Sequence, residues 1–346
     1  VPPIVHRTVG WAIVETMNSK SVEALQACME GLAIEDVSDS SRLLFSLLKA
    51  RARFALAMGK SGAPMLGEIL PPAGLPGMDI DLLYQAWQDI QEAVELFQDG
   101  GWTNNVEFIA DIWAATASML GKQGEVLPLI VDAARVRPHF EGLQTSAETV
   151  AAQCGEFETA LEINTRTADS DTKWLRRTAY LHELNRHRDC VEVFEKHVAH
   201  LDKHHQLFGT VLPMAILSAK KIVKTDLARL WSAIFDSDPK LAPYKAVSEY
   251  LSAIDANNLA KSEALRELEA QYRVLGKTKP IALLLFMELD PTDAAQAATC
   301  IDVANDLRTS TILPGGAAVH LGMALVTTKR WNELFDLCRE SGNQLE

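Results

Sequence analysis

The chain has 346 residues, of which 48% are hydrophobic, so it is long enough to bury a sizeable core. Its 33 Lys and Arg residues against 46 Asp and Glu residues give a formal net charge of −13. That balance argues against a general nucleic-acid binder and against a protein that adheres to anionic membranes. No apolar run reaches the roughly 18 residues that a membrane-spanning helix needs.

The hydrophobic pattern is helical along almost the whole chain. Apolar residues recur at intervals of three and four, and strand-like alternation of β-branched residues is nearly absent. We therefore predict an all-α fold of short helices joined by polar turns. Residues 1–58 are expected to form an N-terminal helical part, and residues 79–344 a helical-repeat array.

Residues 59–78 interrupt this pattern, because Gly or Pro occupies nine of these positions. That density excludes a continuous helix and predicts a long loop, either a plain surface connector or a functional segment. The Gly59-Lys60 pair within it is not a phosphate loop. The chain lacks the earlier glycine of a phosphate loop, and a phosphate loop follows a strand, whereas a helix is predicted here.

Comparison of the chain with itself shows an internal repeat. Leu129, Ala160 and Cys190 are predicted to occupy matching positions, at spacings of 31 and 30 residues. Trp113 and Trp174 match each other two repeats apart. The predicted turns of these three helix pairs are Gly124-Glu125, Gly155-Glu156 and Asn185-Arg186, and Lys329-Arg330 repeats the form near the C-terminus.

These features resemble the tetratricopeptide-repeat family, in which a Gly-x-aromatic turn joins two helices and a small residue follows in the second helix. Gly155, Phe157 and Ala160 fit that pattern, and so does the Leu321-Gly322 pair. The resemblance covers residues 106–203 and 315–342 and is looser over 207–310. It implies an α-solenoid, a right-handed superhelix of stacked antiparallel helix pairs. The period is shorter than the family's roughly 34 residues, so no ligand-binding residues are carried over.

The packing of such pairs leads to an expectation for two tryptophans. Trp113 and Trp174 should be mostly buried between neighbouring helices, since stacked pairs share a continuous core.

The five cysteines are widely spaced, with no C-x-x-C pair. This pattern favours reduced, buried thiols in a cytoplasmic protein over a disulfide framework.

Charge is unevenly distributed. Between Lys173 and Lys224 lie ten Lys and Arg but five Asp and Glu, so this segment is +5 while the remainder is −18. A local excess of cations favours contact with an external anion, such as an acidic peptide, a phosphate or, less readily, nucleic acid. The alternative is a solvated band paired with acidic neighbours. The candidate binding residues are Lys173, Arg176, Arg177, Lys220 and Lys221.

Six of the nine histidines fall between His182 and His205. His197, His200 and His204 are spaced i, i+3 and i+7, which would place them on one helix face and could bind zinc or nickel. The alternative, which we favour, is a solvated helix end, because no Cys or carboxylate is spaced to complete the site. We predict no metal and no cofactor.

No catalytic motif is present in the sequence. We therefore expect a non-catalytic scaffold that binds a protein or peptide, with a ligand-sensing domain of a bacterial regulator and an all-helical enzyme as alternatives. The chain begins Val1-Pro2-Pro3, and the terminal Leu345-Glu346 pair is typical of a cloning scar. Both ends favour a region of a larger protein.

Overall fold

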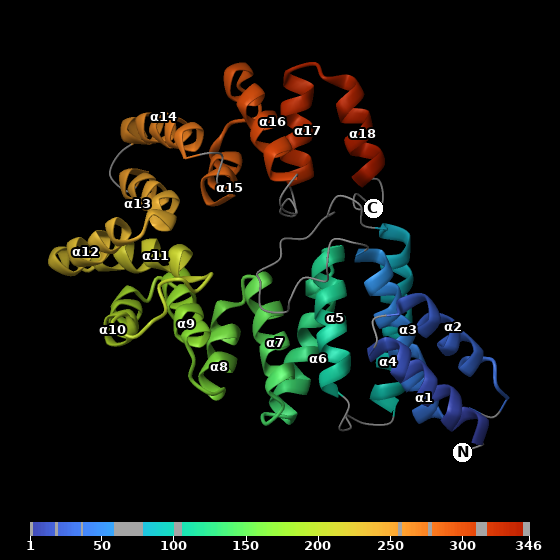
Figure 1. Cartoon of the computed structure of the whole chain (residues 1–346). Helices are drawn as coiled ribbons and strands as arrows, with labels where there is room; N and C mark the ends of the chain where they lie inside the picture. The colour runs from blue at the N-terminus through green and yellow to red at the C-terminus, as the bar shows by residue number, and fades with distance from the viewer. Residues whose placement is uncertain are drawn as a thin grey trace. The chain divides into compact units, whose positions relative to one another are not determined.

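The computed structural model of the chain confirms an all-α fold. It describes residues 3–17, 20–35, 37–58, 79–99, 106–254, 258–275, 279–308 and 317–341. Among these residues lie eighteen α-helices and two 3-10 helices but no strand (Figure 1). None of the described helices combines the length and the apolar character needed to cross a membrane. The predicted loop over 59–78 and the Leu345-Glu346 pair lie outside the described residues.

The chain divides into two compact units, Val1–Glu156 and Phe157–Glu346, and this division falls inside the stretch 79–344 expected to form one array. In the first unit, α1, α3, α5 and α7 pack one against the next, and α2, α4 and α6 pack beside them. The helices of this unit are α1 (Pro3–Met17), α2 (Ser21–Leu32), α3 (Asp39–Met58), α4 (Ile80–Asp99), α5 (Val106–Leu120), α6 (Gln123–Val136) and α7 (Glu141–Gln153).

Close helix packing in the first unit combines apolar contacts with buried ions. Trp113 is 2% exposed, which confirms its predicted burial. A Cβ on Gly31 would lie 2.2 Å from the ring of Phe45, so glycine allows α2 to approach α3. Between α3 and α4, the buried Asp89 carboxylate pairs with Lys49 at 2.9 Å and with Arg53 at 2.7 Å.

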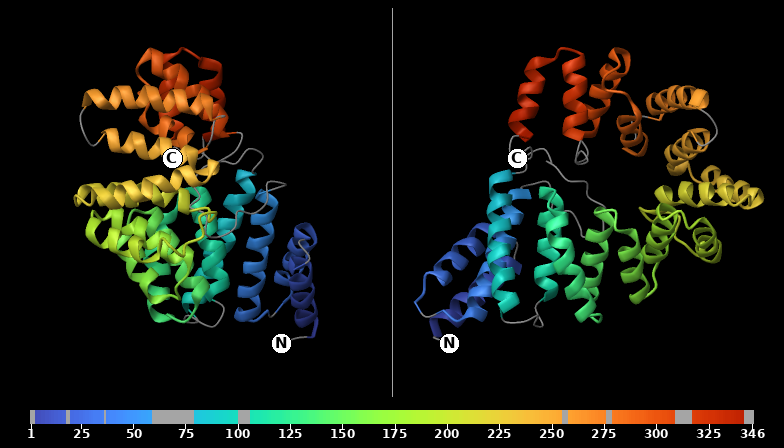
Figure 2. Two further views of the ribbon diagram at one scale, coloured as in Figure 1. Left: turned by 60° about the vertical axis from the view of Figure 1, so that its left-hand side comes forward. Right: turned by 180° about the vertical axis from the view of Figure 1, so that it is seen from behind.

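The second unit repeats this arrangement. Helices α9, α11, α13 and α15 pack in series, α8, α10, α12 and α14 pack beside them, and α16, α17 and α18 follow (Figures 1 and 2). The helices up to α12 are α8 (Phe157–Arg166), α9 (Asp171–Glu183), α10 (His187–His197), α11 (Phe208–Lys221) and α12 (Thr225–Ser232). After them come η2 (Ala233–Ser237), η3 (Pro239–Leu241), α13 (Ala242–Ile254), α14 (Asn258–Val274), α15 (Lys279–Glu288), α16 (Ala294–Arg308), α17 (Ala317–Thr327) and α18 (Trp331–Ser341).

One type of turn recurs in the described part of the chain. A residue with φ between 56° and 76° follows each of five helices: Gly121, Gly155, Asn185, Val223 and Lys329. The next residue's amide then donates to the carbonyl five residues back, at 2.8–2.9 Å, as Arg186 does to Leu181. This is the Schellman arrangement, which satisfies carbonyls that a helix end leaves without partners. The turns therefore define the structural repeat.

The turns correct the repeat register predicted from sequence. The Gly155, Asn185 and Lys329 turns lie where they were expected, but the first alignment is wrong by three residues. The left-handed residue is Gly121, whereas Gly124 is the second residue of α6. Leu129 is accordingly only half-buried. Five residues beyond the first four turns lie the buried residues Val126, Ala160, Cys190 and Ala228, whereas Leu334, at the same place after the fifth turn, is half-buried. The first four turns are 34, 30 and 38 residues apart.

Candidate functional site

The predicted basic residues of α9 do not form an exposed group. The side chains of Lys173 and Arg176 lie in the interior, with 6% and 4% of each residue exposed. α9 begins at Asp171, capped by the Ser170 hydroxyl, which accepts from the Lys173 amide at 3.3 Å. Positions three residues apart share a helix face, so Lys173 and Arg176 lie on the same buried face of α9. These two cations are therefore poorly placed to meet an external partner.

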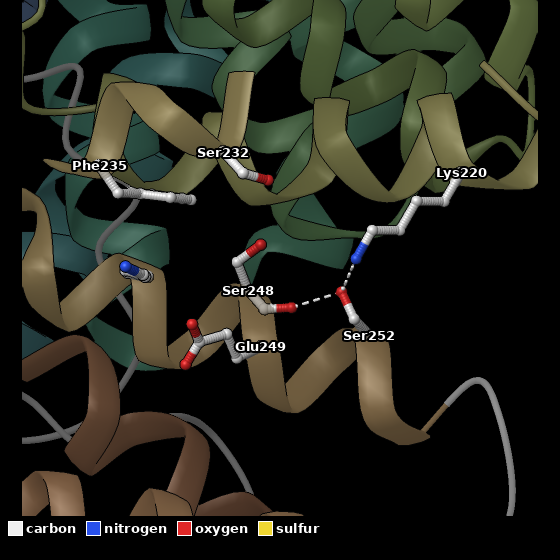
Figure 3. A pocket seen from close by; sticks show the side chains of 7 residues that line it. Lys220, Ser232, Phe235, Ser248, Glu249 and Ser252 are labelled. Atoms are coloured by element: carbon white, nitrogen blue, oxygen red, sulfur yellow. Dashed lines mark hydrogen bonds between the residues drawn. The ribbon is translucent and has the colours of Figure 1, made fainter. Parts of the chain in front are cut away.

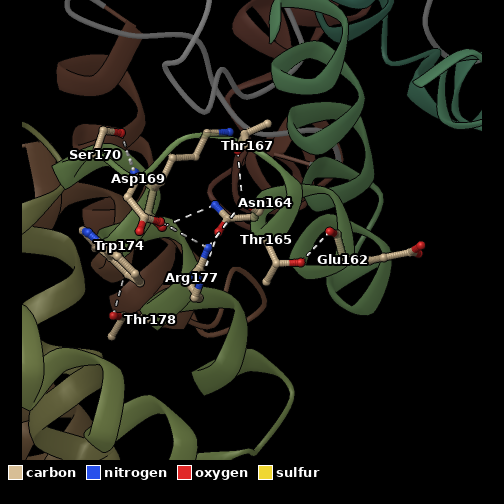
Figure 4. A network of polar contacts seen from close by, with 10 residues as sticks. Glu162, Asn164, Thr165, Thr167, Asp169, Ser170, Trp174, Arg177 and Thr178 are labelled. Atoms are coloured by element: carbon tan, nitrogen blue, oxygen red, sulfur yellow. Dashed lines mark hydrogen bonds and ion pairs between the residues drawn. The ribbon is translucent and has the colours of Figure 1, made fainter. Parts of the chain in front are cut away.

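Arg177 is half-buried in a network with the end of α8 (Figure 4). Its Nε donates to the Asn164 Oδ1 at 2.9 Å, and its Nη2 lies 3.9 Å from the Asp169 Oδ1. The guanidinium also lies over the Trp174 ring, 4.5 Å from the centroid, a favourable cation–π position. Arg177 therefore joins α8 to α9 rather than extending into solvent.

Trp174 is half-buried, which agrees with the prediction that neighbouring helices cover most of it. It packs against the apolar core of the second unit, but the His197 ring stacks on it at 3.6 Å. The pKa of His197 is lowered mainly by burial, helped by nearby Lys196. An imidazole and a guanidinium thus lie against the indole of Trp174, beside its contact with the core.

The three histidines considered as metal ligands are separated. α10 ends at His197, so His200 and His204 leave the helix, and the predicted common helix face is wrong. His204 Nδ1 lies 3.3 Å from the Asp238 Oδ2, whereas His197 stacks on Trp174. Within the described ranges, no group of three His, Cys, Asp or Glu side chains is arranged to hold a metal ion.

A cluster that sequence reasoning missed joins two other histidines to a serine. His182 Nδ1 lies 2.9 Å from the Ser218 Oγ, and His187 Nδ1 lies 3.1 Å from it. A hydroxyl has one proton, so Ser218 donates to at most one ring and accepts from the other. The pKa of His182 is lowered chiefly by burial, and further by the charge of His187. Ser218 is fully buried, so this serine–histidine contact is not an accessible nucleophile.

The buried thiols are equally inert. Burial raises the pKa of Cys28 to about 12 and that of Cys190 and Cys300 to about 11. Since the thiolate is the reactive form, these three side chains stay protonated at neutral pH. Their burial agrees with the prediction that they are structural, and Cys338, which is exposed, departs from it.

Lys220 and Lys221 are the exposed members of the predicted basic group. Both lie in the last turn of α11, where cations complement the helix dipole. Lys220 Nζ donates to the Ser252 hydroxyl of α13 at 2.7 Å. Arg177 contacts α8, which packs on α9, and Lys220 contacts α13, which packs on α11. The two side chains therefore make their contacts with different helices. The structure therefore leaves Lys220 and Lys221 as the exposed part of the candidate site.

Lys220 also stands at the edge of a pocket (Figure 3). The pocket has a volume of about 220 Å³ and lies between α13 and the ends of α11 and α12. Its lining residues are Lys220, Ser232, Phe235, Lys245, Ser248, Glu249 and Ser252. The four residues from α13 are spaced i, i+3, i+4 and i+7, which places them on one helix face. That spacing of polar residues was the signal in the sequence that could have pointed to the pocket.

Comparisons with known proteins do not assign a family. No protein-family model matches the chain, and no curated protein matches its sequence. Among solved structures, the crystal structure of the apo form of RapI is similar, with a TM-score of 0.38 and 11% sequence identity. That match covers 95% of this chain and 99% of the other. A likeness at this level names neither a family nor a partner for this chain.

Proposed function

We propose that the chain is a non-catalytic helical-repeat scaffold that binds an acidic peptide segment of another protein at the exposed end of α11. The observation that carries this proposal is the setting of Lys220. It is exposed, it is bound by the Ser252 hydroxyl, and among the described residues no carboxylate lies within 4.0 Å of its ammonium group. Lys221 adds a second exposed cation beside it.

The burial of reactive side chains favours a scaffold over an enzyme. Ser218 beside its two histidines has no exposed surface, and Cys190 is buried as a protonated thiol. A nucleophile must reach its substrate, and neither side chain can do so in this structure. Helical-repeat surfaces, by contrast, present side chains at fixed spacing to an extended partner.

The overall charge makes the local cations more informative. A chain of net charge −13 repels an acidic partner at long range, so attraction must come from a restricted region. Exposed cations in such a region steer association and select partners more than they add affinity. We therefore expect the binding to depend strongly on salt concentration.

The test is fluorescence anisotropy with a labelled decaglutamate peptide whose ends are blocked, and with decaglutamine as the neutral probe. We expect saturable binding of decaglutamate that weakens as salt rises from about 50 to about 300 mM. Reversal of both cations (Lys220→Glu with Lys221→Glu) should weaken binding by about tenfold or more and flatten the salt dependence. The matched control reverses Lys203 and Lys240, which are equally exposed.

Two results would overturn the proposal. One is decaglutamate that binds no better than decaglutamine at low salt. The other is an equal loss of binding in the Lys220/Lys221 and Lys203/Lys240 double variants, which would show that only the total charge of the chain matters.

A further inference from the structure

Ser248 brings a hydroxyl group to the pocket beside Lys220. The residue as a whole is 5% exposed, but its Oγ is not sealed in the interior and opens onto the pocket. Its carbonyl is occupied, because the Ser252 hydroxyl donates to it at 2.7 Å. Figure 3 shows the Ser248 side chain directed toward Ser232, away from Ser252. A hydroxyl group at the surface of a pocket can donate a hydrogen bond to a group that enters it.

Lys220 supplies a second donor at the same pocket. Ser252 gives its only hydroxyl proton to the Ser248 carbonyl, so it accepts from the Lys220 ammonium at 2.7 Å. An ammonium group has three protons, so Lys220 keeps two for another acceptor. The Ser252 contact therefore holds Lys220 at the pocket edge without satisfying it. Two donors, one neutral and one charged, therefore line the same space.

We infer that this pocket binds the carboxylate side chain of one glutamate or aspartate residue of the acidic peptide, with Lys220 and Ser248 as its hydrogen-bond donors. This inference rests on the proposed function and specifies its central contact. The Phe235 ring, which is 3% exposed, lines the same pocket and gives an apolar wall for the methylene stem of the entering side chain.

The charges around the pocket favour a carboxylate over a phosphate. The second lysine, Lys245, already pairs with the Asp236 Oδ1 at 2.8 Å. Glu249 adds an exposed carboxylate to the lining and would repel a doubly charged group. One uncompensated cation, Lys220, balances one negative charge. A phosphate monoester carries nearly two, for which a second unpaired cation would be needed.

The size of the pocket favours a side chain over a whole metabolite. Its volume of about 220 Å³ is below the roughly 300–1,000 Å³ of pockets that enclose small-molecule ligands. A peptide lying across α11 and α13 can insert one side chain there while the rest of it stays on the surface. Such an anchored side chain fixes the register of the peptide, which surface charge alone does not.

The experiment uses the decaglutamate probe with two Ser248 variants that leave the charge unchanged and one Lys220 variant that removes a positive charge. Ser248→Ala removes the donor and keeps the space, and we expect about fivefold weaker binding. Ser248→Val also fills the space and should weaken binding by about tenfold or more, with an unaltered salt dependence. Lys220→Gln should lower both the affinity and the salt dependence. The matched control is Ser237→Val, since Ser237 is exposed on η2 outside the pocket.

The outcomes separate this inference from the proposed function. Decaglutamate that binds the unaltered chain and Ser248→Val equally well overturns the pocket assignment and leaves the scaffold proposal standing. Decaglutamate that fails to bind the unaltered chain overturns the proposed function itself. A blocked peptide with one phosphoserine that binds more tightly than its glutamate counterpart makes this a phosphate pocket and overturns the inference. Circular dichroism checks folding, and Ser248→Ala decides the question if Ser248→Val unfolds.

Discussion

The first unit joins its two longest helices through a buried carboxylate, whereas in the core of the second unit two aromatic rings meet edge-on. In the first, α3 and α4 each span 20 residues, and the Asp89 carboxylate receives both Lys49 and Arg53 between them. In the second, the Phe194 ring meets the Trp231 ring edge-on at 4.9 Å. Ion pairs in the interior are directional, so they fix the register of the two helices. The free-energy cost of removing their charges from water is offset only while every partner is present. Apolar contacts depend less on exact geometry, because the stabilisation from burying apolar surface is non-directional.

The two tryptophans that the repeat pattern matched test this comparison most strongly. Trp113→Ala should destabilise the first unit by about 4 kcal/mol, because a fully buried indole leaves a cavity. Trp174→Ala should cost the second unit less, about 1–2 kcal/mol, because Trp174 is only half-buried. Urea unfolding of both variants measures the two losses. Equal losses would show that the partial exposure of Trp174 has no energetic weight.

Removal of the central carboxylate should break the ionic contact of the first unit. Asp89→Ala leaves the half-buried Lys49 and Arg53 without their shared carboxylate, and we expect a loss of about 3 kcal/mol. The control is Asp132→Ala, which removes an exposed pair with Arg135 on α6 and should cost less than about 0.5 kcal/mol. Denaturant titration compares the two variants. A loss at Asp89 no larger than at Asp132 would contradict the assignment of a structural role to the buried ions.

A substitution in one of the turns should raise the stability of the second unit, by less than the losses described above. Val223 has φ of 62° and is 80% exposed, so a β-branched residue occupies a left-handed position without packing to compensate. Val223→Gly should stabilise the second unit by about 1 kcal/mol. Val274→Gly, at an exposed valine in the last position of α14, serves as the control and should give no gain. The midpoint of thermal unfolding measures both.

Acidification should affect the two units in opposite directions. The pKa of His182 is lowered by burial, so below its ordinary value of 6.5 the unfolded second unit binds more protons and the folded state loses stability. The pKa of Asp89 is raised by burial from 3.8, so the folded first unit binds more protons as the pH falls toward that value and gains stability. Hydrogen exchange resolved by segment, from about pH 7 to about pH 5, measures the loss in the second unit. His182→Gln should reduce that loss, and an unchanged loss would contradict the role of His182.

The sequence predicted the fold class and several turns but not the site. Three-and-four periodicity is a local property, so it identified helices reliably, and Gly155 and Asn185 marked true turns. The alignment failed at Gly124 because two glycines lie close together there and only the φ of Gly121 decides between them.

Which cations remain exposed could not be predicted from spacing alone. Lys173 and Arg176 are buried because other helices cover their face of α9, and that face is set by packing between residues far apart in the sequence. Lys220 is exposed because it lies in the last turn of α11. The pocket needs Lys220, Ser232 and Ser248 from three helices. The spacing of residues along the sequence shows which of them share a face of α13, but it does not show that three helices meet at one pocket.

The recurring Schellman turn has a consequence for how the second unit forms. Each turn is closed by a hydrogen bond spanning five residues, and packing mostly joins a helix to its next or next-but-one neighbour. Short loops are entropically inexpensive to close, so contacts of this kind form rapidly and from many starting points. A nascent chain could therefore acquire structure pair by pair as it is synthesised. By the same reasoning, opening should spread inward from a terminal pair such as α17 and α18, with the pairs near α11 exchanging last.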